Sequence, residues 1–436
     1  MDVKQSKDKK SRDMKNIRTN TDVDEEEELS SSSSSSSVYL PLELVFSEIF
    51  TRLPVKSLFR FKLVSKSILS LTRNDPSFFN LHLSRSKTRL AATTLLISVF
   101  CGGKWREILS AELDGGGRRR RGRVTQLFTM PKVDHTHYRT LSYDVNGLLC
   151  LSSDPLFNIC PYVCNPTTQQ FVKLPPIEDR ANQIISYFLG FDPSSSKFKV
   201  LNFHLYNYSA IAYDYPGIAY RVFTLGGSSW RTIHPSFPFE EICDWFIKSG
   251  RSVCLNGTIH WFVKAKNAIV AFDLKDENFF VIPAPNCVVM PESKSESESQ
   301  SESESEAVLV QVNGVLAVIH YKRDGSNKTM EMWVLEDYQR HVWINHVITI
   351  DFSSHNYKYF CPIGSTPTGE ILLVPFTSWA LAWGVRIPMI YYDMKNKSCR
   401  IIEIAQLPQC VPWGYIDVRG MTTYTESLIF PTMDDQ

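Results

Sequence analysis

The first patterned stretch of the chain, residues 40–72, places apolar side chains at the spacing of short helices. In its first part the apolar positions recur every three or four residues, at Leu44, Val45, Ile49, Phe50 and Leu53. This spacing predicts one wide apolar face on a helix. Pro41 suits the first turn of that helix, and Pro54 ends it, because the residue before a proline is displaced from the helical region of backbone space.

Two further short helices are predicted downstream, over about residues 55–61 and 65–72. The sequence Asn74-Asp75-Pro76 is the turn signal that follows them. The three helices carry more apolar side chains than one short helical hairpin can bury. The pattern therefore predicts that another surface covers the excess.

From about residue 90 to the end, short apolar runs alternate with turn residues. The runs hold four to eight residues rich in Val, Ile, Phe, Tyr and Trp, and clusters of Gly, Asn, Asp, Ser and Pro separate them. Examples are residues 147–151, 197–203, 220–225, 258–263, 268–274, 314–321, 330–335, 369–375 and 389–394. Short strands with frequent turn signals predict an all-β unit.

The strand-rich region repeats internally. Asn146-Gly147, Asn256-Gly257, Asn313-Gly314 and Thr368-Gly369 each precede a strand. The last three recur about every 55 residues, and the first interval is about twice as long, which leaves room for an unmarked unit near residues 190–192. This period predicts the blades of a β-propeller, with a β-sandwich-like stack of the same strands as the alternative.

Three stretches have the composition of segments that stay outside a core. Residues 1–37 combine lysines, an acidic run and an unbroken run of serines, which predicts a disordered polar tail. Residues 115–123 are rich in Gly and Arg, and residues 292–306 alternate Ser with Glu. Burying these charges would be costly, so both stretches are expected to be loop inserts in the fold.

Length and charge exclude some classes of protein. A chain of 436 residues that is 43% hydrophobic can bury a large core and is expected to hold more than one unit. Basic and acidic residues nearly balance, 47 against 46, so no overall charge draws the protein to nucleic acid or to an anionic membrane. The arginines of residues 115–123 lack interleaved aromatics, which favours a solvated loop over a nucleic-acid site or nuclear import signal.

The start of the chain lacks the apolar core of a signal peptide, and no apolar run approaches the length of a membrane span. The ten cysteines are scattered without paired spacing, which suits a reducing compartment. We therefore expect no membrane association and a cytoplasmic and/or nuclear location.

Enzyme motifs are incomplete. Residues 364–369 have the glycine spacing of a phosphate loop, but Glu370 and Ile371 stand where Lys and Ser or Thr are needed. His135 and His137 could share a metal, yet no Cys or third His stands near them. The sequence therefore predicts no catalytic residue, no metal site and no cofactor, so the protein is not expected to be an enzyme.

Six of the nine tryptophans fall into two groups. Four of them fall in strand patterns and are predicted to pack between blades: Trp230, Trp261, Trp333 and Trp343. Trp379 and Trp383 fall in what should be a loop or a strand end. Contact with a bound target and core packing are equally expected for these two.

Residues 38–84 contain an ordered series of short motifs. They are Leu40-Pro41, Glu48-Ile49, Arg52-Leu53-Pro54, Val55–Leu58, Arg60–Lys62, Val64–Ser67 and Pro76-Ser77-Phe78. Their order and spacing resemble an F-box, the helical motif that docks onto a Skp-type adaptor in SCF ubiquitin ligases. The residues within the motifs are typical of plant F-box proteins. Ile68 stands where the family usually has tryptophan, and this resemblance implies some loss of packing or docking there.

The motifs of residues 90–430 are similar to the F-box-associated, kelch-like domain of the same plant proteins. They are NGLLCL with CNPTTQQFVKLP, LGFDPSSSKFKVLNF, YRVFTLGGSSWRTI, and LNGTIHWFV with AIVAFDL. The expected fold is therefore an α+β multidomain chain, in which a small three-helix F-box precedes an all-β, kelch-like β-propeller.

The F-box resemblance implies a set of adaptor-binding residues. They are Leu40, Pro41, Leu44, Ile49, Leu53, Pro54, Leu58 and Val64. For Leu44 and Leu58, a place in the interface and a place in the helical core are equally expected. Trp379 and Trp383 are the candidates for target binding.

The resemblance implies a substrate-recognition subunit of an SCF-type E3 ubiquitin ligase. Such a subunit binds a Skp-type adaptor, and through it a cullin-RING ligase core, and holds a target protein by its β domain. It performs no chemistry and acts by raising effective concentration. The alternatives are a propeller with its own ligand-binding or enzymatic role, and an adaptor-binding protein that acts outside a ligase.

Overall fold

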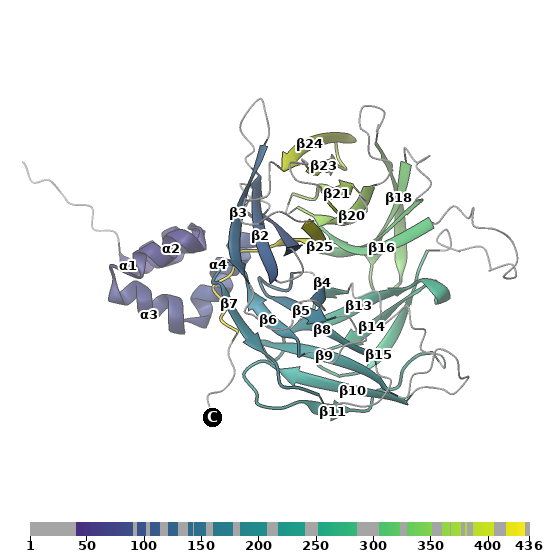
Figure 1. The fold of residues 1–436 in the computed structure, drawn as a ribbon, viewed down its shortest axis with the longest axis horizontal. Coiled ribbons are helices and arrows are strands. Elements are labelled where there is room, and N and C mark those ends of the chain that lie inside the picture. The colour runs from purple at the N-terminus through teal and green to yellow at the C-terminus, as the bar shows by residue number, and fades with distance from the viewer. Residues whose placement is uncertain are drawn as a thin grey trace, which may run out of the picture. The chain divides into compact units, whose positions relative to one another are not determined.

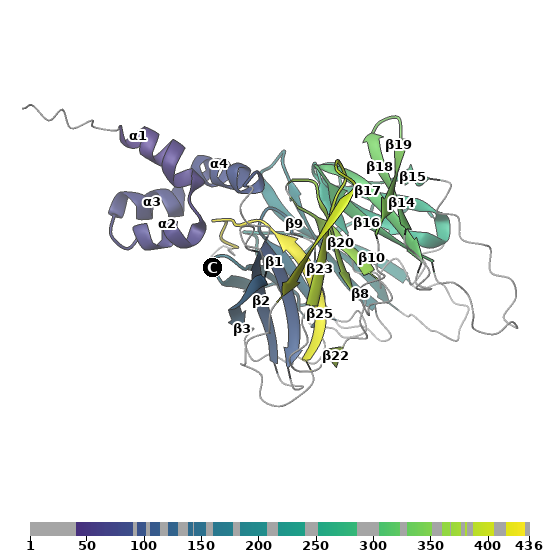
Figure 2. The same ribbon diagram turned by 90° about the horizontal axis from the view of Figure 1, so that it is seen from above.

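The fold is taken from a computed structural model. It describes residues 41–89, 94–101, 105–113, 121–129, 138–142, 144–153, 160–177, 184–206, 217–239, 252–285, 305–322, 329–350, 360–366, 368–375, 380–381, 387–404 and 416–431. From Leu42 onward the chain forms one unit, in which helices precede β-sheets (Figures 1 and 2). The predicted tail, residues 1–37, lies outside the described residues.

All the described helices except the 3-10 turn Lys264–Lys266 lie within Leu42–Lys87, called here the helical region. They are α1 (Leu42–Leu44), a π-helical turn (Val45–Ile49), a 3-10 turn (Phe50–Arg52), α2 (Val55–Phe61), α3 (Lys66–Asn74) and α4 (Pro76–Lys87). The first predicted helix is thus split into three short pieces. None of the described helices is long and apolar enough to cross a membrane.

Helix α4 was not predicted, since the sequence indicated three helices and a turn at Asn74-Asp75-Pro76. The Asp75 side chain accepts hydrogen bonds from the backbone N–H groups of Ser77 (2.9 Å) and Phe78 (3.0 Å). Pro76 takes the first helical position, where its missing N–H costs nothing. The same residues that break α3 therefore start α4.

The strands form five hydrogen-bonded sheets, four of which have four strands in sequence order. Their strands are β4 (Tyr138–Leu141), β5 (Leu149–Ser153), β6 (Tyr162–Asn165) and β7 (Gln170–Lys173); β8 (Ile184–Asp192), β9 (Lys197–Tyr206), β10 (Gly217–Thr224) and β11 (Arg231–Ile233); β12 (Val253–Leu255), β13 (Thr258–Val263), β14 (Ala268–Asp273) and β15 (Phe279–Pro283); β16 (Ser305–Val312), β17 (Val315–Lys322), β18 (Thr329–Asp337) and β19 (Val342–Thr349). Neighbouring strands within each sheet are antiparallel.

The fifth sheet has nine strands in the order β20-β21-β23-β24-β3-β2-β1-β25-β22. They are β1 (Thr94–Cys101), β2 (Trp105–Leu113), β3 (Arg121–Thr129), β20 (Phe360–Ser365), β21 (Ile371–Pro375), β22 (Ala380–Leu381), β23 (Ile387–Asp393), β24 (Ser398–Ile404) and β25 (Ile416–Tyr424). It comprises two four-stranded antiparallel sets, β20-β21-β23-β24 and β25-β1-β2-β3, and the two-residue β22 beside β25. A short parallel contact between β24 and β3 joins the sets at Glu403–Arg121 and Ile404–Gly122.

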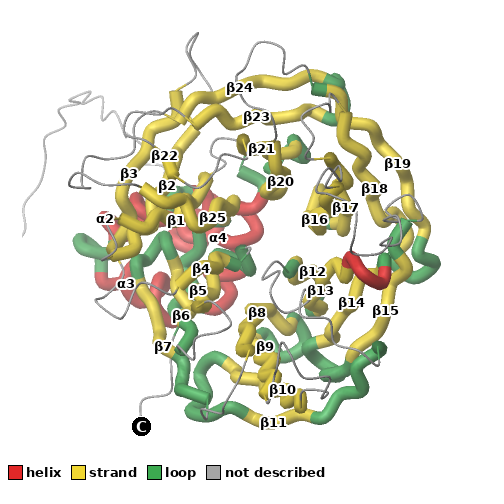
Figure 3. The backbone as a smooth tube through the Cα atoms, turned by 45° about the vertical axis from the view of Figure 1, so that its right-hand side comes forward, coloured by secondary structure: helices red, strands yellow, loops and turns green. Residues whose placement is uncertain are grey.

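The sheets are arranged as blades around a central axis, which is the predicted β-propeller (Figure 3). The ring closes where the C-terminal strand β25 pairs antiparallel with β1, as in the pairs Leu95–Thr423 and Ile97–Met421. Strands from the two ends of the β region thus lie side by side. This closure excludes the β-sandwich-like alternative.

The repeated Asn-Gly turns join the first strand of a set to its second. At Asn256-Gly257 the φ angles are 51° and 83°, and at Asn313-Gly314 they are 51° and 81°. A tight hairpin turn of this type needs positive φ at both central residues, which Asn and Gly tolerate best. The unmarked unit predicted near residues 190–192 is the β8–β9 hairpin.

Both predicted inserts are shorter than expected. Arg121–Arg123 begin strand β3, where Gly122 and Arg123 pair with β2 and Arg121 pairs with Glu403 of β24, so they are not part of a loop. Ser305 and Glu306 begin β16, where they pair with β17. The rest of both inserts, residues 115–120 and 292–304, lies outside the described residues.

Aromatic side chains fill the space between neighbouring blades. Trp261 on β13 is fully buried, with its ring 5.0 Å from that of Phe188 and 5.7 Å from that of Phe203 on the preceding sheet. Trp343 on β19 is only partly buried and donates a hydrogen bond to the Pro283 carbonyl (3.0 Å). Trp230, between β10 and β11, donates a hydrogen bond from its indole N–H to the Pro175 carbonyl (2.9 Å), which follows β7 of the preceding sheet. The predicted interblade role is confirmed for Trp230, Trp261 and Trp343, while Trp333 lies half-buried on β18.

We expect Trp261→Leu to lower the free energy of unfolding by about 3 kcal/mol, because it removes buried contacts and leaves a cavity. Trp343→Leu is the matched control, since the loss of one hydrogen bond and of partly exposed packing should cost only about 1 kcal/mol. Urea unfolding followed by circular dichroism measures both. Equal losses of unfolding free energy in the two variants would contradict the interpretation of Trp261 as a core residue between blades.

Candidate functional site

The helical region leaves several large apolar side chains in solvent. The exposed fractions are 49% for Leu44, 45% for Ile49, 41% for Phe61, 82% for Leu63 and 81% for Val64. These five residues are called here the exposed apolar surface. Large apolar side chains that several neighbouring elements leave in solvent often mark a site where a partner docks.

The turn after α2 holds Leu63 and Val64 outward. Backbone hydrogen bonds run from Leu63 N–H to the Arg60 carbonyl (3.2 Å) and from Val64 N–H to the Phe61 carbonyl (3.0 Å). The Ser65 side chain then accepts a bond from Ile68 N–H and starts α3. Because local backbone bonds set this turn, its two apolar side chains stay exposed without a partner.

The adaptor-binding residues implied by the sequence fall into three groups. Pro41, Leu44, Ile49, Pro54 and Val64 are exposed; Leu53 is half-buried; Leu58 is fully buried. Leu40 lies outside the described residues. Of the two roles expected for Leu58, the structure shows core packing, while Leu44 lies in the exposed apolar surface.

Phe61 and Leu63 were missed by the sequence reasoning. Both flank Lys62 at the end of α2, next to Val64, which was included. Periodicity from the buried Val55 and Leu58 could have indicated them, because it leaves position 63 off the core face. Ile68, which replaces the usual tryptophan, is 6% exposed, so its side chain packs within the helical region.

A charged brace joins α4 to the first helical turns. Glu48 accepts hydrogen bonds from Arg52 and from Arg85, each at 2.9 Å. Arg85 also donates to the Ser47 carbonyl and to the Thr51 hydroxyl. The hydrogen bonds from Arg52 and then Arg85 hold the pKa of the Glu48 carboxyl below its ordinary value. The brace fixes the helices that present Leu44 and Ile49.

His82 on α4 lies in the core of the helical region, next to Phe78. Its side chain is fully buried, and its Nε2 contacts the Leu53 carbonyl oxygen at 3.0 Å. Since a carbonyl accepts, Nε2 carries the proton and donates it. Burial lowers the pKa of His82 to about 4, and the positive charge of Arg89 adds to the effect.

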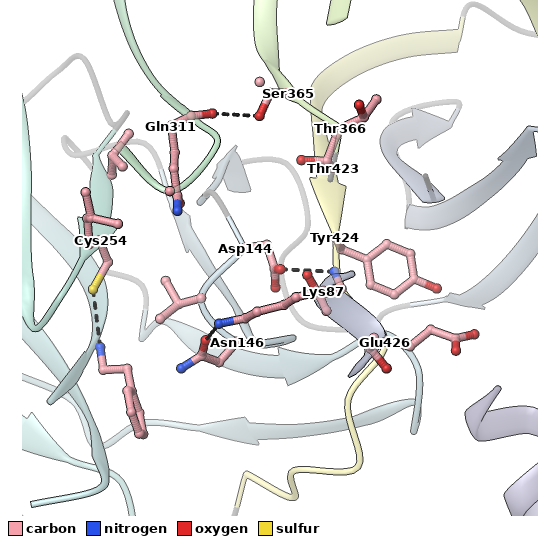
Figure 4. Close-up of a pocket in the computed structure, with 18 of the residues that line it drawn as sticks. Lys87, Asp144, Asn146, Cys254, Gln311, Ser365, Thr366, Thr423, Tyr424 and Glu426 are labelled. Atoms are coloured by element: carbon pink, nitrogen blue, oxygen red, sulfur yellow. Dashed lines mark hydrogen bonds between the residues drawn. The ribbon is translucent and has the colours of Figure 1, made fainter. Parts of the chain in front are cut away.

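A cavity of about 1040 Å³ opens at one end of the propeller (Figure 4). It is lined by the Asn-Gly turns, by the end of β25, and by Ser86, Lys87 and Arg89 at the end of α4. Lys87 donates a hydrogen bond to the Asn146 side chain (2.6 Å). This end of the ring, called here the near end, is therefore next to the helical region.

Several polar side chains that line the cavity stabilise the turns and strand ends around it. Asp144 accepts bonds from Gly147 N–H (2.7 Å) and Thr425 N–H (3.0 Å), and burial raises its pKa to about 6. The asparagines Asn256 and Asn313 supply the positive φ of their turns. Among the described residues, no three His, Cys, Asp or Glu side chains gather as a metal site.

Comparison with known proteins agrees with this geometry. The family described as "F-box domain" matches residues 39–80, and the "F-box associated beta propeller domain" matches residues 116–427. The chain belongs to the F-box proteins with an associated β-propeller. Its helical region is the F-box, a domain that generally binds Skp-type adaptors.

Curated relatives come from Arabidopsis thaliana. F-box protein At3g57590 is 30% identical over 350 residues, which cover 77% of this chain and 78% of the relative. F-box protein At2g21930 is 27% identical over 84% of this chain and 86% of the relative. F-box/kelch-repeat protein At4g19930 is also 27% identical, over 85% of this chain and 86% of the relative.

Among solved structures, one from a nidogen/laminin complex aligns over 77% of this chain and 99% of its own, with 10% identity and a TM-score of 0.40. That similarity is too low to support an inference about this chain.

Acidification should lower the stability of α4 in the F-box against unfolding. Below pH 6.5 the unfolded chain binds a proton on His82, whereas the folded chain does so only near pH 4, so stability falls over this window. At pH 5 the loss from His82 is about 2 kcal/mol. Hydrogen exchange of α4 amides at pH 7 and pH 5, corrected for intrinsic rates, measures it.

The control is His82→Gln, which cannot take up the proton. Its α4 amides should show a smaller increase in corrected exchange between the two pH values than those of the natural chain. An equal increase in both proteins would contradict the assignment to His82.

Proposed function

We propose that this protein is a substrate-recognition subunit of an SCF-type E3 ubiquitin ligase. Its F-box binds a Skp-type adaptor, and through it a cullin-RING core, and its propeller holds the target protein. The observation that carries this proposal is the exposed apolar surface on the F-box, in which Leu63 and Val64 are more than 80% exposed. A partner's apolar side chains would remove this surface from water.

The protein itself contributes no chemical step in this role. It brings a target close to the ubiquitin-charged enzyme, and the rate rises because the encounter becomes intramolecular. The proposal places the protein in the cytoplasm or the nucleus, as the sequence predicts.

We place the target at the end of the propeller opposite the near end, called here the far end. Residues of α4 line the cavity at the near end, so the F-box occupies part of that end. Because the strands of each set are antiparallel, connections after the second and fourth strands emerge at the far end. Strand β21 ends there at Pro375, just before Trp379 and Trp383, which lie outside the described residues.

The described residues at the far end also include aromatic and cationic side chains suited to contact a target. Phe237 and Phe239 follow β11, are partly exposed, and lie with their rings 6.2 Å apart. Lys266, on the turn between β13 and β14, is exposed with its Nζ 6.0 Å from the Phe239 ring. Aromatic rings beside a cation are common anchors of protein interfaces. They support a target surface at this end.

Adaptor binding should depend on the exposed apolar surface. We expect Leu63→Asp with Val64→Asp to weaken binding of a Skp-type adaptor by roughly 100-fold, because charges would be buried against the partner. The unfolding midpoint should stay unchanged, since both side chains are in solvent. Co-purification followed by calorimetric titration measures the loss.

The matched control for this experiment is Val347→Asp, which adds a charge at a 53% exposed valine on β19 of the propeller. It should leave adaptor binding intact. If the double variant binds as tightly as the natural chain, the F-box does not act through this surface and the proposal fails.

Target modification should depend on the far end. We expect Phe239→Ala with Lys266→Glu to keep full adaptor affinity but to remove proteins from the set that the reconstituted ligase ubiquitinates in cell extract. Quantitative mass spectrometry of ubiquitin remnants compares this variant with Val347→Asp. An unchanged set would place target contacts elsewhere on the propeller.

A further inference from the structure

The last described residues, Thr425–Pro431, are called here the C-terminal segment. They continue directly from β25, the strand that closes the ring. Figure 2 shows this yellow chain end running from β25 toward the helices. The segment contacts the F-box on one side and the propeller on the other.

On the F-box side, Leu428 completes the helical core. Its side chain is 1% exposed and packs with Val55, Leu58 and Phe78, which are 0%, 0% and 4% exposed. A helical unit of this size buries little apolar surface by itself. One of the four buried side chains in this cluster therefore comes from the opposite end of the sequence.

Glu426 adds a polar contact beside Leu428. Its carboxylate accepts from Arg89 (2.9 Å) and from the backbone N–H of Val55 (3.4 Å), at the first turn of α2. A carboxylate at a helix N-terminus satisfies a free N–H and suits the helix dipole. Arg89 also donates to the Leu53 carbonyl (3.1 Å), so the pair holds the loop that enters α2.

On the propeller side, Asn165 anchors the segment to the first four-stranded sheet. Its buried side-chain amide donates to the Ser427 carbonyl (3.0 Å) and to the Ile429 carbonyl (2.8 Å). Gly147 lies directly against the segment: a Cβ there would overlap Ser427 Cβ and lie 2.9 Å from the Thr425 carbonyl oxygen. The segment keeps this position only where residue 147 has no side chain.

We propose that the C-terminal segment couples closure of the propeller to the folding of the F-box, and so to adaptor binding. Only when β25 pairs with β1 does Leu428 reach the F-box core, because the segment begins where β25 ends. The adaptor part of this inference rests on the proposed function. By linkage the effect is reciprocal, so adaptor binding stabilises the closed ring.

Two glycines allow the coupling to be tested without replacing any residue of the F-box or of the segment. Gly147 and Gly314 both lie in Asn-Gly turns, with φ of 85° and 81°, so alanine brings similar backbone strain at each. At Gly314 a Cβ meets nothing within 4 Å, whereas at Gly147 it displaces the segment. Gly314→Ala is therefore the matched control for Gly147→Ala.

The measurement is hydrogen exchange of the full-length chain, together with titration by a Skp-type adaptor. In Gly147→Ala we expect amides of α2 and α4 to exchange at least tenfold faster and adaptor affinity to fall roughly tenfold. Amides of β16–β19 keep their protection. Gly314→Ala leaves the F-box amides and the affinity unchanged. The coupling would be overturned if the F-box amides of Gly147→Ala exchanged at the rate of the natural chain. It would also be overturned if both variants lost F-box protection and adaptor affinity equally.

A second variant, Leu428→Ala, covers the case in which Gly147→Ala also loses protection in β16–β19 and so fails to fold. It shortens the side chain in the F-box core and keeps the turn intact, and the same selective loss in α2 and α4 is expected. If the natural chain binds no adaptor, the proposed function fails, while the exchange readout still decides whether the segment supports the F-box.

Discussion

The pairing of β25 with β1 is the interaction on which the rest of the structure depends. It brings the two ends of the β region together and turns a row of sheets into a ring. It also delivers the C-terminal segment to the F-box, where Leu428 and Glu426 contact α2 and its entry loop. One antiparallel ladder therefore supports both the propeller and the helical unit in front of it.

The F-box illustrates a conflict between stability and binding. It must bury enough apolar surface to fold, yet it keeps Leu63 and Val64 in water at a cost in solvation. The buried cluster around Leu58, the brace on Glu48 and the contact with Leu428 offset that cost. In the proposed function, the apolar side chains that remain exposed, Leu63 and Val64 among them, are the ones that meet a partner.

The propeller was predictable from sequence because its turns have strict backbone requirements. Asn-Gly pairs recur at three of the turns that lead from a first strand to a second, and positive φ at both positions restricts the residue choice there. The β8–β9 unit lacks this pair and was placed by spacing alone. Arg121–Arg123 were predicted as a loop because their basic composition outweighed any strand pattern in so short a run, yet they pair with β2 and β24.

The candidate site was only partly predictable. Local periodicity shows that Leu58 and Leu63 are apolar positions in one helix and its turn, but their roles depend on which face meets the rest of the F-box. Helix α4 was missed because Pro76 indicates both an end and a start. The role of Leu428 has no local signal, since its partners lie more than three hundred residues away.

The proposed arrangement assigns opposite roles to two surfaces of one chain, and cross-linking distinguishes them directly. A photo-reactive residue would replace Leu63 in one protein and Phe239 in another, each mixed with a Skp-type adaptor. We predict a covalent adduct with the adaptor from position 63 and none from position 239. An adduct from position 239 alone would contradict the account, because it would place the adaptor on the propeller.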